Sequence, residues 1–248
     1  MHASTEHYGP LTCRRIDWLP EGVSPQLGVV LCHGYGAPGT DLVPIAQELV
    51  AIQPALKDRV QFLFPEAPRS LEDIGMPFGR AWWPLNLAKL QQQIAARRIE
   101  EVREACPPGM PEARDALTTA ITEWFAATGL TWSRCVLGGF SQGAMACMET
   151  AVHLTERPAG LVVLSGALVN EREWRTQAAR GTPPRVFQSH GRYDVVLPYA
   201  MGLWLQELFL TCGWPGEFLE FPGSHEIPYE VLEALGEFLV AIPSESSL

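Results

Sequence analysis

A serine between two glycines stands in the pentapeptide Gly-Phe-Ser-Gln-Gly at residues 139–143. A strand-like apolar run over residues 135–138 precedes it directly, and a helix-like pattern follows. A tight turn from strand to helix strains the serine backbone, and side chains two residues to either side would collide with that turn. The pattern therefore predicts Ser141 as an exposed nucleophile, although a glycine-rich turn without chemistry would share it.

A serine hydroxyl needs a histidine to take its proton and a carboxylate to orient that histidine. After Ser141 the only aspartate is Asp194, and after Asp194 the only histidine is His225. They follow strand-like runs over residues 185–189 and 217–221. Because parallel strands end at one edge of a sheet, we expect the three residues to meet there, with His225 as general base and Asp194 as its orienting acid.

Several polar residues nearby allow plainer interpretations. Asp194 could cap a turn, and His225 could face solvent in its glycine-rich loop. Glu226 could replace Asp194 as the acid in principle, but a neighbour in sequence has poor geometry for a hydrogen bond to Nδ1 of His225. His153 lies in the helix after the serine and His190 at a strand end, so we expect both to be structural.

A second turn is expected to help bind the oxyanion that forms when serine attacks a carbonyl. Residues 31–37 read Leu-Cys-His-Gly-Tyr-Gly-Ala and follow the first central strand. We assign the two oxyanion amides to Tyr35 in this turn and to Gln142 after the nucleophile, where a helix N-terminus adds its dipole. His33 is expected to bond nearby backbone and hold the turn in shape.

The elements that must position these residues alternate along the chain. Apolar runs bounded by glycine and proline predict strands at 28–32, 60–64, 135–138, 161–165, 185–189 and 217–221. Helical periodicity predicts helices at 42–52, 112–127, 143–154, 199–212 and 229–241. Continuous apolar strands are typical of a parallel sheet covered on both faces. We therefore predict a three-layer α/β/α sandwich with a mostly parallel sheet, plus one or two antiparallel edge strands around residues 11–19.

One stretch does not fit this alternation and is too long for a simple loop. Residues 66–111 carry Met76, Phe78, Trp82 and Trp83, followed by an amphipathic piece over 89–106. We expect this insertion to act as a lid or to line the substrate site, with those four side chains forming an apolar wall. The whole chain, residues 1–248, is otherwise expected to form a single domain.

Composition narrows the classes of partner. The formal net charge of −10, without a block of lysine or arginine, argues against nucleic acid and anionic membrane surfaces. No apolar run is long enough to span a bilayer, and residues 1–20 contain no signal-peptide core, so we expect a cytoplasmic protein. The six cysteines form no close pair and are expected to be buried reduced thiols, with a disulfide or metal site as alternatives.

In these motifs the chain resembles the phospholipase/carboxylesterase family of the α/β-hydrolase fold, which includes the acyl-protein thioesterases. It resembles the bacterial carboxylesterase-like members of that family in particular. The matching stretches are Leu-Cys-His-Gly-Tyr-Gly at 31, Gly-Phe-Ser-Gln-Gly at 139, His-Gly-Arg-Tyr-Asp-Val-Val-Leu-Pro at 190 and Gly-Ser-His-Glu-Ile at 223. In the family a tryptophan after the second central strand lines the acyl site, which implies Trp83 or its neighbour Trp82 here. The family often has Trp-Phe-Asp at that place, whereas this chain has Trp-Trp-Pro-Leu-Asn.

The resemblance implies cofactor-independent hydrolysis of small-molecule carboxylic esters or thioesters through an acyl-enzyme, without a metal site. A peptidase or an acyltransferase would use the same three residues, and a catalytically silent ligand-binding protein could share the fold. The sequence leaves open whether the protein is a monomer or a homodimer.

Overall fold

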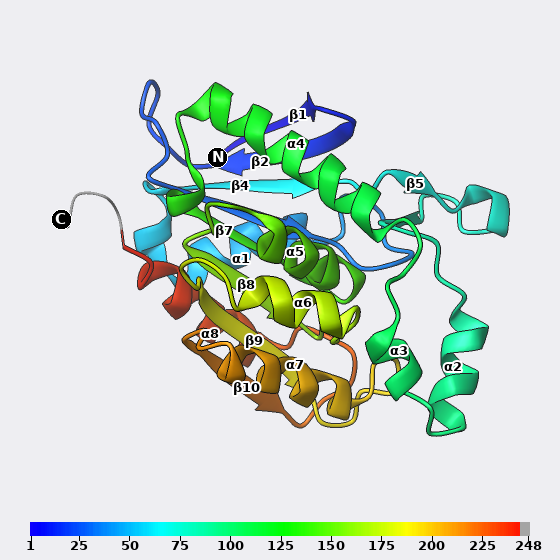
Figure 1. Ribbon diagram of the computed structural model, residues 1–248. Coiled ribbons are helices and arrows are strands. Elements are labelled where there is room, and N and C mark those ends of the chain that lie inside the picture. Colours follow the sequence, from blue (N-terminus) through cyan, green and yellow to red (C-terminus); the bar gives the residue numbers. More distant parts are fainter. Residues whose placement is uncertain (244–248) are drawn as a thin grey trace.

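The computed structural model describes residues 1–243 and is built on one eight-stranded sheet (Figure 1). The strands lie in the order β1-β2-β4-β3-β7-β8-β9-β10; β1 and β2 pair antiparallel, as do β2 and β4, and the remaining neighbours are parallel. Their bounds are β1 (His2–Tyr8), β2 (Leu11–Asp17), β3 (Leu27–Cys32), β4 (Val60–Pro65), β7 (Cys135–Phe140), β8 (Gly160–Leu164), β9 (Arg185–Gly191) and β10 (Gly216–Phe221). The predicted mostly parallel sheet and its antiparallel N-terminal edge are confirmed.

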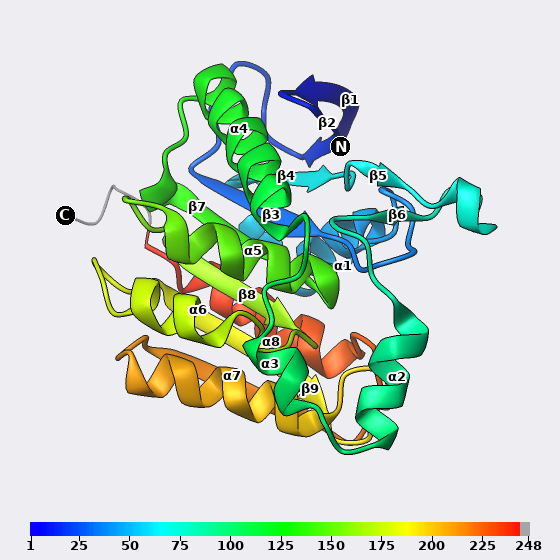
Figure 2. The same ribbon diagram turned by 45° about the vertical axis from the view of Figure 1, so that its right-hand side comes forward.

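Helices cover both faces of the sheet and complete the predicted three layers (Figures 1 and 2). One face packs against α1 (Val43–Ile52) and α8 (Tyr229–Val240), and the other against α4 (Met110–Thr128), α5 (Gln142–His153), α6 (Glu171–Ala178) and α7 (Tyr199–Thr211). Short 3₁₀ turns, η1 (Pro54–Leu56) and η3 (Trp132–Arg134), precede β4 and β7. The five predicted helices are confirmed with small shifts at their ends, whereas α6 was not predicted.

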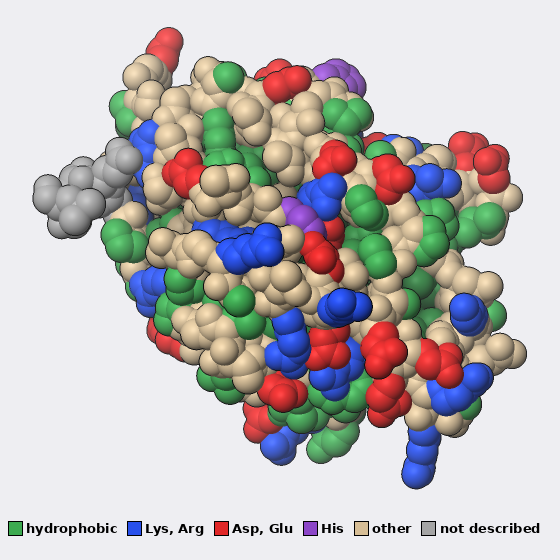
Figure 3. All heavy atoms as spheres, viewed as in Figure 1, with side chains coloured by type: hydrophobic (Ala, Val, Ile, Leu, Met, Phe, Trp, Pro, Cys, Tyr) green, Lys and Arg blue, Asp and Glu red, His purple; other side chains and the backbone are tan. Residues whose placement is uncertain are grey.

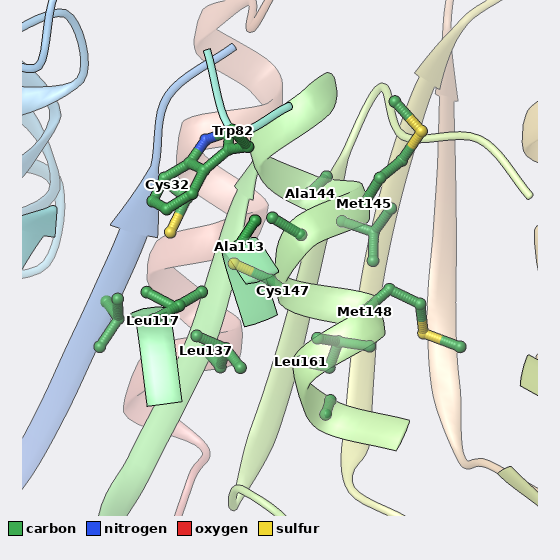
Figure 4. Close-up of a cluster of buried hydrophobic side chains, with 14 of the residues drawn as sticks. Cys32, Trp82, Ala113, Leu117, Leu137, Ala144, Met145, Cys147, Met148 and Leu161 are labelled. Atoms are coloured by element: carbon green, nitrogen blue, oxygen red, sulfur yellow. The ribbon is translucent and has the colours of Figure 1, made fainter. Parts of the chain in front are cut away.

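Two apolar clusters, one on each side of the sheet, hold these layers together. Alternate residues of β3 enter opposite clusters: Val30 and Cys32 pack toward α4 and α5, and Val29 and Leu31 toward α1 and α8. Figure 4 shows the first cluster, in which side chains of the sheet meet α5. Because the central strands β3, β4, β7 and β8 are buried on both faces, their sequences are almost continuously apolar, and this made them recognisable in the sequence.

The insertion at 66–111 lies beyond the ends of the central strands (Figures 1 and 2). It contains the small hairpin β5 (Arg69–Ser70) and β6 (Arg80–Ala81) with η2 (Glu72–Ile74) between them, then α2 (Leu87–Ala95) and α3 (Glu100–Glu104). The amphipathic piece predicted at 89–106 is thus two helices, separated where Arg97 takes a φ of 55°. An ion pair between Arg103 and Glu171 joins α3 to α6.

The surface of the described chain mixes charges of both signs. On the face of α4 to α7, basic and acidic side chains lie next to one another (Figure 3). On α4, for example, Arg114 pairs with the exposed Asp115 at 2.9 Å. Among residues 1–243 no helix is long and apolar enough to cross a membrane. All six cysteines are free thiols; those at 13, 32, 135 and 147 are buried as predicted, but Cys106 is exposed and Cys212 is partly exposed.

Candidate active site

The turn that carries Ser141 has the strained geometry that its glycines predicted. β7 ends at Phe140, α5 begins at Gln142, and Ser141 between them has φ 54° and ψ −119°. A Cβ on Gly139 would lie 2.5 Å from the backbone oxygen of Cys32, and one on Gly143 only 2.1 Å from it. Larger residues at these two positions would force the turn away from β3, so the glycines let the serine sit at the strand end.

The structure brings the three predicted residues together at the carboxyl ends of β7, β9 and β10. Nε2 of His225 lies 2.9 Å from Oγ of Ser141, and Nδ1 of His225 lies 2.7 Å from Oδ2 of Asp194. The Asp194 side chain is fully buried, whereas that of His225 is 14% exposed. Since a carboxylate only accepts hydrogen bonds, Nδ1 of His225 carries a proton and Nε2 is free to accept the serine proton.

Backbone amides fix the carboxylate of Asp194 from its other side. Oδ1 accepts hydrogen bonds from the amides of Val196 and Leu197, both at 2.8 Å. His190, the first residue of the same motif, is fully buried and donates from Nε2 to the carbonyl of Leu197 at 2.8 Å. Burial lowers the pKa of His190, which favours its neutral form next to the carboxylate. This is the structural role expected of His190.

His153 and Glu226 lie outside the hydrogen-bonded trio of Ser141, His225 and Asp194. Nδ1 of His153 bonds the carbonyl of Glu149 within α5, one turn back along the helix. Glu226 accepts a hydrogen bond from the amide of Ser224 at 3.0 Å. Oδ2 of Asp194 therefore occupies the position at Nδ1 of His225 that Glu226 would need as a replacement acid.

The predicted oxyanion turn lies beside the serine. Tyr35 and Gln142 both line the cavity that also contains Ser141 and His225. Gln142 is the first residue of α5, so its amide belongs to the first turn, whose amides have no acceptor within the helix. The turn is anchored to β6, because Gly36 donates to the carbonyl of Arg80 at 2.8 Å and Arg80 donates to that of Ala37 at 3.1 Å.

His33 holds this turn in shape, as predicted. Its Nδ1 donates to the carbonyl of Gly34 at 2.8 Å, and its Nε2 accepts from the amide of Ala67 at 3.1 Å. This pattern requires the neutral imidazole, and burial lowers the pKa of His33 accordingly. His33 therefore has no nitrogen left for proton transfer.

A cavity of about 800 Å³ opens at Ser141, within the size range of small-molecule sites. One wall comes from the insertion, through Trp83, Leu90 and Val102. The rest of the apolar lining comes from α5, α7 and the loops beside them. The apolar side chains in this part of the cavity are Met145, Ala167, Val169, Leu197 and Met201.

Of the four side chains predicted to form the apolar wall, the structure places only Trp83 on this cavity. Trp82 is buried behind it, where its indole nitrogen donates to the carbonyl of His33 at 2.9 Å. Met76 packs against the backbone of Gly36, and Phe78 is 84% exposed at a φ of 73°. The position of a residue within the insertion did not reveal where its side chain points. Phe78 lies in the β5–β6 hairpin, and its side chain faces solvent.

Sequence reasoning missed most of the cavity wall. The apolar face of α2, formed by Leu87, Leu90 and Ile94, repeats every three to four residues and was the available signal. Leu87 and Leu90 line the cavity, and Ile94 packs against the core behind it. Met145 and Met201 gave no such signal, since their helices are apolar on the core side throughout.

Comparison with known proteins assigns the chain to a family. A family model described as phospholipase/carboxylesterase matches residues 20–242. The chain belongs to the phospholipase/carboxylesterase family. The resemblance inferred from its four motifs is confirmed.

Relatives and solved structures agree with this family. Acyl-protein thioesterase 1 of Candida albicans is 25% identical over 225 residues, covering 88% of this chain and 93% of that protein. Its namesake from Saccharomyces cerevisiae is 24% identical and covers 85% of this chain and 90% of that protein. The crystal structure of esterase PE8 is 25% identical with a TM-score of 0.77, covering 98% of this chain and all of that one.

A carboxylesterase from Mesorhizobium loti has the same fold, with 16% identity and a TM-score of 0.73 over 97% of this chain and all of the other. The α/β-hydrolase fold predicted from the motifs is therefore confirmed. As a member of the phospholipase/carboxylesterase family, the protein is a hydrolase that cleaves ester bonds, which is the predicted enzyme class.

Proposed function

We propose that the protein cleaves carboxylic esters or thioesters through an acyl-enzyme on Ser141, with His225 as general base and Asp194 as the residue that orients it. The observation that carries this proposal is the continuous pair of contacts from Ser141 to His225 at 2.9 Å and from His225 to Asp194 at 2.7 Å. This is the arrangement that serine hydrolysis requires.

In the proposed acylation step, Oγ of Ser141 attacks the substrate carbonyl carbon while Nε2 of His225 takes the hydroxyl proton. The carbonyl oxygen becomes an oxyanion, which the amides of Tyr35 and Gln142 stabilise. The carbon–oxygen or carbon–sulfur bond to the leaving group then breaks, and His225 returns the proton to that group. Water, activated by the same histidine, releases the acid and restores Ser141.

The apolar lining of the cavity suits an uncharged acyl group, and we propose one of short to medium length. The lining is mainly apolar, with Trp83, Leu90 and Met201 among the side chains that an acyl chain would meet. The thioester part of the proposal draws on the acyl-protein thioesterase relatives. We propose that residues 66–111 act as a substrate-lining element of a single domain, and that the enzyme works in the cytoplasm, where free thiols such as its six persist.

Labelling with a fluorophosphonate probe tests the proposal directly. The probe phosphonylates a serine only when a base and an oxyanion site activate it, so we expect stoichiometric labelling of the folded protein at Ser141. The Ser141→Ala variant and the urea-unfolded protein serve as controls and should remain unlabelled. Folded protein that resists the probe would instead favour a silent ligand-binding role.

Replacement of Trp83 by alanine should change the preference for acyl length. Trp83 is buried at the cavity wall, so its removal enlarges the space beside the acyl chain. We expect kcat/KM for butyrate-sized esters to fall by about 10-fold, because one or two lost methylene contacts are worth about 1–3 kcal/mol, while longer esters lose less. A series of nitrophenyl esters measures this, with the exposed Phe78→Ala as control; an unchanged profile for Trp83→Ala would remove Trp83 from the acyl site.

A further inference from the structure

The side chain of Gln142 makes two hydrogen bonds that the chemistry described above does not use. Its Oε1 accepts from the backbone amide of Trp82 at 2.9 Å, and its Nε2 donates to the backbone carbonyl of Trp83 at 2.9 Å. The residue is only 1% exposed. The amide group thus pairs with the backbone of 82–83 much as a neighbouring strand would, and it fixes that segment to the start of α5.

The segment held by Gln142 in turn holds the oxyanion turn. The indole of Trp82 donates to the carbonyl of His33 at 2.9 Å, immediately before the turn. Two residues earlier, Arg80 exchanges backbone hydrogen bonds with Gly36 and Ala37, the two residues that follow Tyr35 in the turn. A continuous chain of contacts therefore runs from the side chain of Gln142 through Trp82 to the turn that contains Tyr35.

We propose that the side chain of Gln142 is a positioning residue that sets the distance between the two oxyanion amides. One amide is the backbone N–H of Gln142 itself, and the other is that of Tyr35. This inference rests on the proposed function, because it takes those two amides as the oxyanion donors. The residue after the nucleophile would then act twice: its backbone binds the oxyanion, and its side chain holds the second donor in place.

The proposal predicts a loss in kcat more than in substrate binding. Donors that are fixed in advance stabilise charge developing in the transition state, and a displacement of about 1 Å at such a site costs about 100-fold in rate. The ground-state carbonyl carries less charge and is less sensitive to the same displacement. Loosening the turn should therefore leave KM for a short ester nearly unchanged.

The variant Gln142→Met keeps the backbone amide and the side-chain length but removes both hydrogen bonds. We expect its kcat for a short nitrophenyl ester to fall about 10- to 100-fold. A second variant, Trp82→Phe, removes only the indole donor to His33 and should lower kcat by a similar mechanism. Because both act on one chain of contacts, the double variant should lose much less than the product of the two single losses.

The chain offers a matched control pair far from the site. Gln61 lies near the amino-terminal end of β4, away from the strand ends that carry the site, and is also buried. Its side chain accepts a hydrogen bond from the indole nitrogen of Trp124 and donates one to Asp17. Gln61→Met and Trp124→Phe also remove buried hydrogen bonds of a glutamine amide and an indole, here to side chains, and should likewise lower the melting temperature. We expect neither control to change kcat per folded molecule.

The inhibition constants Ki of two matched ketones distinguish positioning of the oxyanion amides from a general effect on the fold. A trifluoromethyl ketone adds to Ser141 and places a charged oxygen between the two amides, whereas the matching methyl ketone chiefly reports binding of the acyl chain. Gln142→Met should raise Ki for the trifluoromethyl ketone about 10- to 100-fold, in step with its loss of kcat, and leave Ki for the methyl ketone within about 2-fold.

Two results would overturn the inference. One is an unchanged kcat and trifluoromethyl-ketone Ki in Gln142→Met; the other is a loss that Gln61→Met reproduces per folded molecule. Failure of the proposed function is distinguishable, because it would appear in the wild-type protein as an unlabelled Ser141 with fluorophosphonate. If wild-type Ser141 is labelled but Gln142→Met leaves kcat and the trifluoromethyl-ketone Ki unchanged, only the positioning role is rejected.

Discussion

The Ser141→Ala variant is expected to lose about 10⁴- to 10⁶-fold in kcat toward a nitrophenyl ester, because no acyl-enzyme can form without Oγ. The residual rate above water would come from substrate binding and from the amides of Tyr35 and Gln142, which the substitution leaves in place. Initial-rate kinetics with purified protein measures the loss. Activity near the wild-type value would mean that another residue is the nucleophile.

The same position allows a separate test of backbone strain. Ser141 has φ 54°, a conformation that alanine tolerates no better than serine, so Ser141→Ala should keep the wild-type melting temperature. Glycine adopts this conformation freely, and Ser141→Gly should therefore raise stability by about 1 kcal/mol, equivalent to roughly 2–4 °C. Equal melting temperatures for the glycine and alanine variants would show that the turn stores no strain.

The sequence was sufficient to predict the fold and the meeting of the three site residues. Strands buried on both faces have to be apolar throughout, so their pattern stood out without knowledge of the partners. Because parallel strands end at one edge, chain order alone placed Asp194 and His225 beside Ser141. The edge strands β1 and β2 were predicted only roughly, since a half-exposed strand such as β1 has a weaker apolar pattern.

The parts that were missed depend on direction and on contacts between distant segments. Helix α6 is mostly polar and buries only Trp174 and Ala178, so its apolar periodicity was too weak to recognise. Phe78 and Trp83 were both predicted to belong to the apolar wall, yet Phe78 is exposed to solvent and Trp83 lines the cavity. The bonds of Gln142 span about 60 residues of chain and have no local signal.

The Asp194→Asn variant is expected to lose about 10⁴-fold in kcat with little change in KM, a size seen when the acid of another serine hydrolase is replaced in this way. The two amides of Val196 and Leu197 decide which way the new side chain faces. Its carbonyl oxygen must accept their hydrogen bonds, as Oδ1 does now, which leaves the NH₂ group pointing at Nδ1 of His225. A donor there favours the tautomer that carries its proton on Nε2, and that nitrogen can no longer accept from Ser141.

Glu226→Gln is the matched control for this change, because it also converts a carboxylate to an amide one residue from His225. Oε1 of Glu226 accepts a hydrogen bond from the amide of Ser224 in a loop, and an amide oxygen can do the same. We expect its kcat to stay within about 2-fold of wild type, as for surface changes that leave the reacting groups in place. A large loss in Glu226→Gln with a small one in Asp194→Asn would reverse the assignment of the acid. Both variants remove a negative charge near His225, but only Asp194→Asn changes the group that contacts Nδ1 of His225. A difference in kcat between them therefore reports that contact and not the loss of charge.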